Sequence, residues 1–171
     1  MADRPAIDTL AAHHLDRVLA INNASARETS PLDRAGLAHL VEQSVYARVT
    51  GIEPSAVDAF VIAMDQDADY ESPNFRWFKA RLEAFLYIDR VVVAQTARGK
   101  RLARTLYEDL FAFGRGAGHR FVACEVNRDP PNPRSDAFHA ALGFSEAGAA
   151  VLAEMGKTVR YLVKPLSPMG E

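Results

Sequence analysis

The clearest pattern of hydrophobic and polar positions lies between residues 85 and 118. Residues 85–93 form a run rich in aromatic and β-branched side chains, which is typical of a strand buried between two layers. A polar segment follows at residues 95–101, and then apolar side chains recur at helical spacing, at Leu102, Leu106 and Leu110. This spacing predicts a long helix with one buried face, which a glycine cluster beginning at Gly114 would end.

The rest of the chain predicts further strands and helices. Alternating or continuous apolar runs indicate strands at residues 6–10, 45–49, 56–64, 120–126, 149–154 and 158–163. Helical periodicity indicates helices over residues 15–21, 33–44 and 135–142. Asp8 or Thr9 is expected to cap the first helix and Asp33 the second. Residues 127–133 are expected to form a rigid loop.

Length and composition restrict the class of protein. The 171 residues suit one domain, residues 1–171, with its own hydrophobic core. The formal net charge of −2 argues against a general nucleic-acid binder. The single cysteine, Cys124, allows no intrachain disulfide and suits a reducing compartment. Because no signal peptide or membrane-span pattern is visible, we expect a soluble cytoplasmic protein.

The polar segment at residues 95–101 carries the strongest indication of a ligand. It contains no apolar side chain larger than alanine, so it faces solvent or a ligand. Gly99 lets a polyanion approach the backbone, and the first amides of the following helix are unpaired donors at the positive end of its dipole. Cationic side chains add to this field, namely Arg98, Lys100, Arg101 and Arg104. These features predict a phosphate-bearing ligand, although neither the Walker nor the dinucleotide glycine pattern is present.

Two motifs in this chain resemble those of the GCN5-related N-acetyltransferase (GNAT) superfamily. The first is the superfamily's Arg/Gln-x-x-Gly-x-Gly/Ala motif, which here consists of Arg98, Gly99, Lys100, Arg101, Leu102 and Ala103. It departs from the pattern at Arg101, where the superfamily has glycine. The second matches at Asn132, Ser135, Gly143 and Phe144, with His139 where the superfamily commonly has tyrosine. Because both motifs occur in the expected order with a strand between them, we treat the pair as a strong resemblance.

The resemblance implies an α+β fold with three α/β/α layers. Its mixed, mostly antiparallel twisted sheet would have about six or seven strands and about four or five flanking helices. The fourth and fifth strands would splay apart and admit the pantetheine arm of acetyl-CoA. The backbone at Val91, Val92 and Val93 would pair with that arm, and the amides of residues 98–103 would hold the diphosphate. Asn132 and Ser135 would also lie at the coenzyme.

The implied reaction is direct attack of an amine, from a small molecule or a protein, on the thioester. Such a site needs a proton acceptor for the amine and a donor for the departing thiolate. Glu125 is our first candidate for the base, with Asp89 as the alternative, and His139 is the candidate for the acid. No metal is expected, because the adjacent His13 and His14 should point apart and lack a third ligand nearby.

Two questions stay open at this stage. Residues 70–87 hold six aromatic side chains, which an inserted helix in the core, a lid over the acceptor pocket or a homodimer contact would cover. The alternative to an N-acetyltransferase is a non-catalytic acyl-CoA-binding or regulatory module, which would keep the coenzyme site and lack an acceptor site.

Overall fold

A computed structural model describes residues 4–25 and 29–168, and the chain divides into two compact units. Unit 1 comprises the residues up to 69 together with 88–113, and unit 2 comprises residues 70–87 and those from 114 onward. The strand β4 (Phe85–Val93) has the predicted bounds and contributes to both units.

Unit 1 combines an antiparallel meander with three helices. Its strands are β1 (Ile7–Thr9), β2 (Tyr46–Thr50), β3 (Ala59–Asp65) and the second part of β4. Its helices are α1 (Leu15–Ala24), α2 (Arg34–Gln43) and most of α4 (Leu102–Gly116), with short 3-10 turns at Ala12–His14 and Gln95–Ala97. β1 pairs with β2 and β2 with β3, both antiparallel. Six of the seven residues of β3 are buried, which agrees with its continuous apolar sequence.

The two helix caps predicted for unit 1 have different outcomes. The Asp33 carboxylate accepts a hydrogen bond from the Gly36 amide at 2.7 Å, so the predicted cap of α2 is confirmed. The predicted cap of the first helix by Asp8 or Thr9 is wrong, because the 3-10 turn at Ala12–His14 precedes α1. That turn is instead closed by the Ala11 amide, which donates to Nδ1 of His14 at 2.9 Å.

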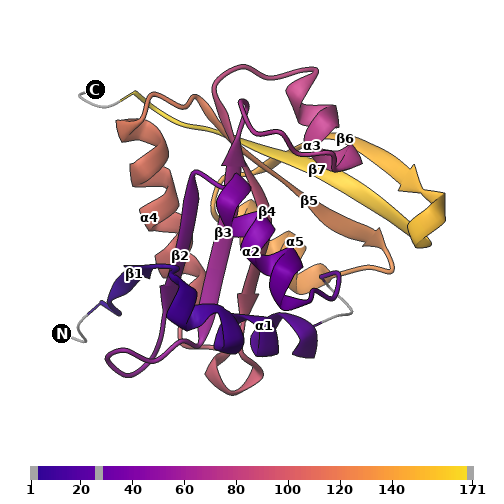
Figure 1. Cartoon of the computed structure of the whole chain (residues 1–171). Helices are drawn as coiled ribbons and strands as arrows, with labels where there is room; N and C mark the ends of the chain where they lie inside the picture. The colour runs from indigo at the N-terminus through magenta and orange to yellow at the C-terminus, as the bar shows by residue number, and fades with distance from the viewer. Residues whose placement is uncertain (1–3, 26–28, 169–171) are drawn as a thin grey trace. The chain divides into compact units, whose positions relative to one another are not determined.

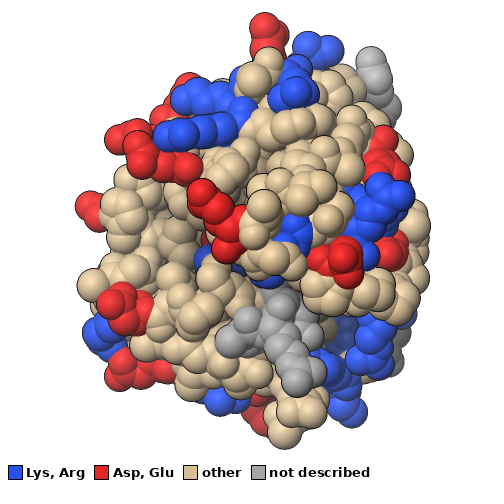
Figure 2. Space-filling view, turned by 90° about the vertical axis from the view of Figure 1, so that its right-hand side faces the viewer, with Lys and Arg blue, Asp and Glu red and all other residues tan. Residues whose placement is uncertain are grey.

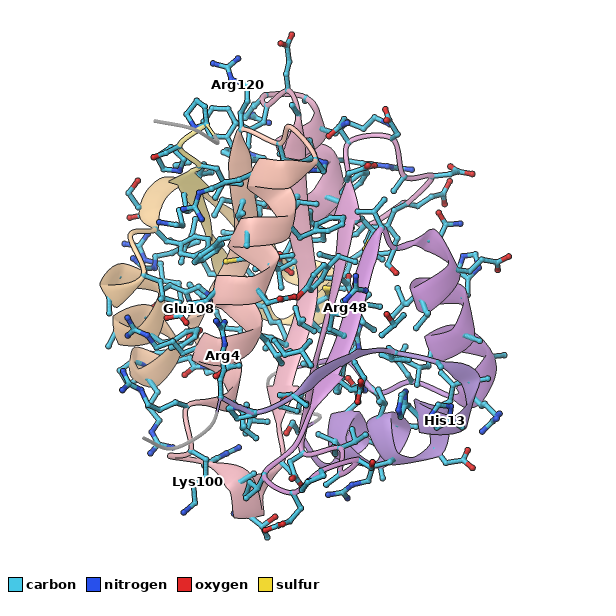
Figure 3. All side chains as sticks on the ribbon, turned by 90° about the vertical axis from the view of Figure 1, so that its left-hand side faces the viewer. Arg4, His13, Arg48, Lys100, Glu108 and Arg120 are labelled. Carbon is cyan, nitrogen blue, oxygen red and sulfur yellow. The ribbon has the colours of Figure 1, made fainter. Side chains whose placement is uncertain are left out.

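The long helix α4 buries the face that its sequence predicts. Leu102, Leu106 and Leu110 are buried. Arg4 is attached to the exposed side of α4, where its guanidinium donates to the Thr105 carbonyl at 3.2 Å and lies 3.6 Å from the Glu108 carboxylate (Figure 3). The amphipathic pattern therefore correctly predicts which face of this helix is buried.

Unit 2 contains the first part of β4, two helices and the remaining strands. These are α3 (Pro73–Lys79), β5 (Phe121–Asp129), α5 (Pro133–Ala141), β6 (Ser145–Leu152) and β7 (Lys157–Pro165), with a 3-10 turn at Ala153–Met155. β4 pairs in parallel with β5 through Phe85–Tyr87 and Phe121–Ala123. β7 lies antiparallel between β5 and β6, and Figure 1 shows β6 and β7 as the predicted closing hairpin.

The prediction of a loop over residues 127–133 is wrong in its first part. β5 continues to Asp129, where Asn127 pairs with Val159 and Asp129 with Thr158 across a register shift. The strand extends because β7 supplies pairing partners there, which the local sequence does not reveal.

The aromatic segment at residues 70–87 is explained by packing within unit 2. Ser72 caps α3 by accepting from the Phe75 amide at 3.4 Å, and Phe75 and Phe78 are fully buried. Their rings contact Tyr87, with centroids 5.7 and 5.9 Å away. The hypothesis of an inserted helix in the core is confirmed for these side chains.

The fold class agrees with the prediction of a mixed α+β protein. Seven strands follow the hydrogen-bonded order β1-β2-β3-β4-β5-β7-β6, with β4 and β5 parallel, and five α-helices accompany them in the described part of the chain. The splay between β4 and β5 and the single-domain organisation stay predictions. Acidic and basic side chains intermingle over the face in Figure 2, in keeping with the small net charge. Within residues 4–25 and 29–168, every helix is too short or too polar to cross a bilayer.

Candidate active site

The turn between β4 and α4 has an unusual backbone conformation. Gly99 has φ of +83° and Arg101 has φ of +62°, so two residues of this turn occupy the left-handed region. Glycine adopts that conformation freely, whereas a residue with a Cβ atom is strained by about 1 kcal/mol or more. The turn therefore keeps at Arg101 the backbone shape that a glycine would favour, although the side chain is present.

This turn combines backbone amide donors with three basic side chains that form no ion pair with the described residues. The Thr105 amide donates to the Arg101 carbonyl at 3.0 Å, so the helix begins here and leaves the amides of its first turn unpaired. The side chains of Arg98, Lys100 and Arg101 make no hydrogen bond or ion pair with any other residue that the structure describes. Figure 3 shows Lys100 at this turn. Arg104 differs, since it pairs with Glu108 at 3.1 Å.

The end of β4 alternates in burial. Val92 is buried, whereas Val91 and Val93 are partly exposed. The Ala94 amide donates to the Asp58 carbonyl at 2.7 Å, which fixes the strand end to the segment before β3. The three valines and the turn at residues 98–103 are thus consecutive parts of one strand–turn–helix unit within unit 1.

Asp89 lies in a buried ion pair. Its carboxylate is 2.8 Å from Nε of Arg90, and both side chains are buried. The same guanidinium donates to Oδ1 of Asn22 at 3.0 Å and to the Ser30 carbonyl at 3.1 Å. These contacts favour a structural role for Asp89.

Glu125 lies on β5 in a cluster of polar and aromatic side chains. The Tyr87 hydroxyl donates to Oε2 of Glu125 at 2.7 Å. Glu125 is directly opposite Tyr161 in the antiparallel β5–β7 ladder, so both side chains project from the same face. Burial and then the charge of Glu125 raise the pKa of Tyr161. Glu125 also raises the pKa of the neighbouring Cys124 thiol, although burial is the larger cause.

The second motif forms the start and the interior of α5. Asn132 caps this helix, with Oδ1 accepting from the Ser135 amide at 3.2 Å. Nδ1 of His139 is 2.7 Å from the Ser135 carbonyl and 3.3 Å from the Ser135 hydroxyl. Gly143, with φ of +92°, ends the helix as predicted.

The environment of His139 specifies its protonation state. A carbonyl oxygen can only accept, so Nδ1 carries the proton. The ring is 5% exposed and contacts Phe138 and Phe144 edge-on. Burial lowers the pKa of His139, which favours the neutral ring. In that tautomer Nε2 has a lone pair and no proton, so the ring as it stands is suited to accepting a proton there.

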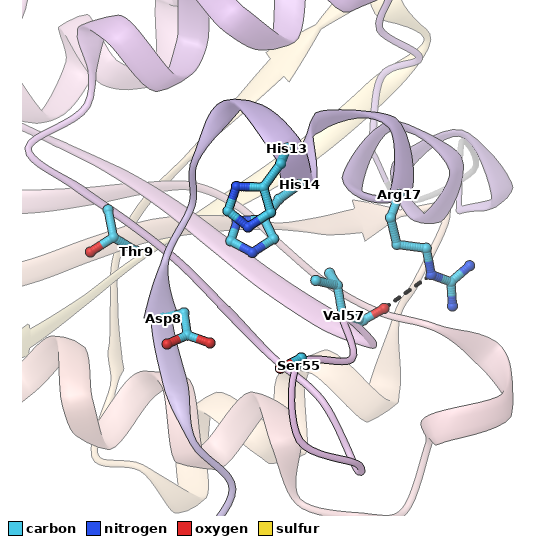
Figure 4. Close-up of a pocket in the computed structure, with 7 residues that line it drawn as sticks. All are labelled: Asp8, Thr9, His13, His14, Arg17, Ser55 and Val57. Carbon is cyan, nitrogen blue, oxygen red and sulfur yellow. Dashed lines mark hydrogen bonds between the residues drawn. The ribbon is translucent and has the colours of Figure 1, made fainter.

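The two N-terminal histidines lie in an open hollow of about 590 Å³ in unit 1, lined also by Asp8, Thr9, Arg17, Ser55 and Val57 (Figure 4). The prediction that His13 and His14 point apart is wrong, because the 3-10 turn brings their ring centroids within 3.9 Å. Arg17 donates to the Val57 carbonyl at 3.0 Å. No group of three or more His, Cys, Asp or Glu residues suited to a metal ion occurs in residues 4–25 and 29–168.

The structure thus assembles the predicted residues in separate clusters. Residues 91–93 and 98–103 form one continuous segment in unit 1, whereas Glu125 and the group of Asn132, Ser135 and His139 lie in unit 2. Sequence reasoning missed Tyr87 and Tyr161, which flank Glu125, and Asn74, which accepts from the Tyr161 hydroxyl. The aromatic content of residues 70–87 was a signal for Tyr87, but it does not specify strand register, and Tyr161 lies outside that segment.

Comparison with known proteins is consistent with these motifs. The family model described as "Acetyltransferase (GNAT) family" matches residues 69–144. No curated protein matches this sequence significantly.

Three solved structures illustrate the similarity of fold. The ribosomal-protein-S18-alanine N-acetyltransferase of Escherichia coli aligns with a TM-score of 0.71 at 18% identity, covering 98% of this chain and 97% of that one. Ard1 of Thermoplasma volcanium gives a TM-score of 0.76 at 14% identity, with 96% and 99% covered. The putative acetyltransferase yncA of Salmonella typhimurium, solved with acetyl-CoA, gives 0.73 at 16%, with 99% and 98% covered. The family model thus matches the central part of this chain, and the three solved structures share its fold.

Proposed function

We propose that this protein is an N-acetyltransferase that transfers the acetyl group of acetyl-CoA to an amine. The observation that carries the proposal is the turn at residues 98–103, where left-handed Gly99 and Arg101 precede the unpaired amides of α4. Unpaired amides at the positive end of a helix dipole bind phosphate groups well.

The residues of the turn fit the diphosphate of coenzyme A. Open space surrounds the position that a Cβ atom of Gly99 would occupy, so an anion can approach the backbone closely. Arg98, Lys100 and Arg101 have no partner among the described residues and can neutralise its charge. Val91 and Val93, partly exposed at the end of β4, would offer backbone groups to the pantetheine arm. When bound, acetyl-CoA supplies the activated thioester.

The chemistry that the chain must supply is proton transfer. The amine nitrogen bonds to the acyl carbon, the carbon–sulfur bond breaks, and coenzyme A leaves as a thiol once its sulfur is protonated. A protonated amine cannot attack, so we assign Glu125 to accept its proton, directly or through one water. Asp89 is less suited because Arg90 already pairs with it. His139 is the remaining candidate for the sulfur's proton donor, and it would first have to acquire a proton on Nε2.

Supporting observations for the substrate class come from other proteins. The Escherichia coli structure is titled as a ribosomal-protein-S18-alanine N-acetyltransferase. Two other similar structures are titled as an N-acetyltransferase of Staphylococcus aureus and as a putative phosphinothricin N-acetyltransferase. They support an amine, from a small molecule or a protein, as the acceptor. We place the reaction in the cytoplasm, where acetyl-CoA is available and a lone cysteine stays reduced.

Calorimetric titration with coenzyme A tests the binding step. We expect saturable binding that weakens with salt, and a loss of affinity of about tenfold or more in Arg98→Glu. Lys157→Glu, at the start of β7, makes the same change of charge and serves as the matched control. No binding by the wild-type protein, or equal losses in both variants, would refute the proposed coenzyme site.

A thiol-release assay with acetyl-CoA across amines and peptides tests turnover. The neutral His139, at the position where the superfamily commonly has tyrosine, favours a second candidate, a non-catalytic acyl-CoA-binding module. Acceptor-dependent thiol release supports the transferase. Tight coenzyme binding with no release for any acceptor supports the module.

A further inference from the structure

The hydroxyl groups of two tyrosines near Glu125 are used in different ways. Tyr87 and Tyr161 are both buried to 1% exposure and come from strands on either side of β5. The Tyr87 hydroxyl donates to Oε2 of Glu125 at 2.7 Å, whereas the Tyr161 hydroxyl donates to Oδ1 of Asn74 at 2.8 Å. Each hydroxyl has one proton to donate, so Tyr161 does not use its proton on Glu125.

The registers of the β4–β5 and β5–β7 ladders place both tyrosines beside Glu125. Tyr87 pairs with Ala123 in the parallel β4–β5 ladder, and Glu125 is two residues further along β5, on the same face as Ala123. Glu125 is itself opposite Tyr161 in the β5–β7 ladder. The carboxylate therefore lies between two rigid rings, and Tyr87 is the one that supplies a donor.

Packing by α3 keeps both rings in place. Tyr161 stacks on Trp77 with ring centroids 4.3 Å apart and meets Phe78 edge-on at 5.2 Å. Tyr87 contacts Phe75 and Phe78 of the same helix. Because buried rings in a close-packed core have few alternative rotamers, the Tyr87 hydroxyl is held in one position. A donor fixed in advance orients a carboxylate without a further ordering cost.

We propose that Tyr87 is a positioning residue for Glu125, and that α3 holds the Tyr87 ring in place through Phe75 and Phe78. The hydrogen bond is charge-assisted and favours the ionised form of Glu125, which is the form that accepts a proton. Other titratable or charged groups in this part of unit 2 are Cys124, beside Glu125, and Arg81, whose charge acts on Tyr161. The catalytic meaning of this inference rests on the proposed function, whereas the hydrogen bond itself does not.

A matched pair of variants tests the assignment. Tyr87→Phe and Tyr161→Phe each remove one hydroxyl from a buried tyrosine, and only the first removes the donor to Glu125. The titration of the Glu125 carboxyl is followed by NMR with carbon-13-labelled glutamate. We expect its midpoint to rise by about one pH unit in Tyr87→Phe and to stay within a few tenths of a unit in Tyr161→Phe.

Enzyme kinetics provide the second measurement. In Tyr87→Phe the acid limb of the kcat/KM profile should move to higher pH by the same amount, with kcat reduced about tenfold. Tyr161→Phe should lower thermal stability, because Asn74 loses its partner, and should leave the acid limb unchanged. An unchanged NMR midpoint in Tyr87→Phe, or equal shifts in both variants, would overturn the positioning role.

Failure of the proposed function gives a different result. If Glu125 is not the base, Glu125→Gln keeps the wild-type kcat while the NMR midpoint still rises in Tyr87→Phe. The hydrogen bond would then stand, and its catalytic meaning would be refuted.

Discussion

The turn at residues 98–103 and the cluster around Glu125 form their candidate sites in different ways. The turn presents backbone amides, whose position depends on the φ angles of Gly99 and Arg101. The cluster presents a carboxylate, which accepts from the Tyr87 hydroxyl of β4 and lies opposite Tyr161 of β7, whose ring stacks on α3. If the turn binds its ligand through backbone amides, it tolerates a changed side chain as long as the conformation is kept, as it is at Arg101. The cluster around Glu125 is more sensitive to substitution, because loss of one tyrosine hydroxyl removes a hydrogen bond that no backbone group replaces.

The largest expected effect comes from removing the charge of the cluster. Glu125→Gln should lower kcat by about 10²- to 10⁴-fold, because it removes a positioned proton acceptor. Affinity for coenzyme A should change little, since the turn that we assign to the diphosphate lies in a different segment. Steady-state kinetics and calorimetry measure the two effects, and Glu154→Gln, in the exposed 3-10 turn before β7, is the control. A matched loss of coenzyme affinity would show that the two sites are not separable in this way.

The second effect concerns the support of the cluster by α3. A Cβ atom at Gly148 would lie 2.5 Å from Cζ2 of Trp77, whose ring stacks on Tyr161 and has the Arg81 guanidinium 4.0 Å from its centre. Gly148→Ala should therefore reduce the free energy of unfolding by about 1–3 kcal/mol, measured by urea denaturation. Gly116→Ala is the control, because it ends a helix with open space around the new methyl group. Similar stabilities for the two variants would mean that Trp77 shifts without cost.

The third effect separates conformation from charge in the turn. Arg101→Gly and Arg101→Ala both remove the guanidinium, and only glycine relieves the left-handed conformation. We expect Arg101→Gly to be more stable than Arg101→Ala by up to about 1 kcal/mol, reduced in part by the greater entropy of glycine in the unfolded chain. Both should bind coenzyme A more weakly than the wild type. If Arg101→Gly binds as tightly as the wild type, the arginine side chain makes no contribution to the ligand.

The smallest effect is a pH dependence of stability from His139. Burial lowers its pKa, so below its ordinary value of about 6.5 the unfolded chain binds more protons than the folded protein. Stability from this group is complete above pH 6.5 and is lost as pH falls, by at most about 1.4 kcal/mol per unit. Denaturation between pH 7.5 and 5 should show a flatter dependence in His139→Gln than in the wild type. His14 also has a pKa lowered by burial, so the pH dependence of the wild-type protein does not report on His139 alone. The change caused by His139→Gln is therefore compared with the change caused by His39→Gln, which replaces an exposed histidine.

Local sequence predicted the elements and the turn that we assign to the coenzyme. Residues 85–93 and the helix from Leu102 have the bounds and burial that their apolar periodicity predicts, and Gly99, Asp33 and Gly143 act where their local chemistry suggests. These features depend on groups close together in the chain. For the same reason the turn that we propose for phosphate binding is recognisable in a single run of six residues.

Tertiary structure decided the surroundings of Glu125. The sequence suggested a carboxylate on the fifth strand, but it could not indicate that Tyr87 donates to Glu125 while Tyr161 donates to Asn74. Glu125 is 38 positions from Tyr87 and 36 from Tyr161, and strand register brings these three residues onto one face of the sheet. Asn74, 87 positions from Tyr161, is contributed by α3. A shift by one residue would turn each side chain to the opposite face, so register, a property of paired strands, determines the candidate chemistry here.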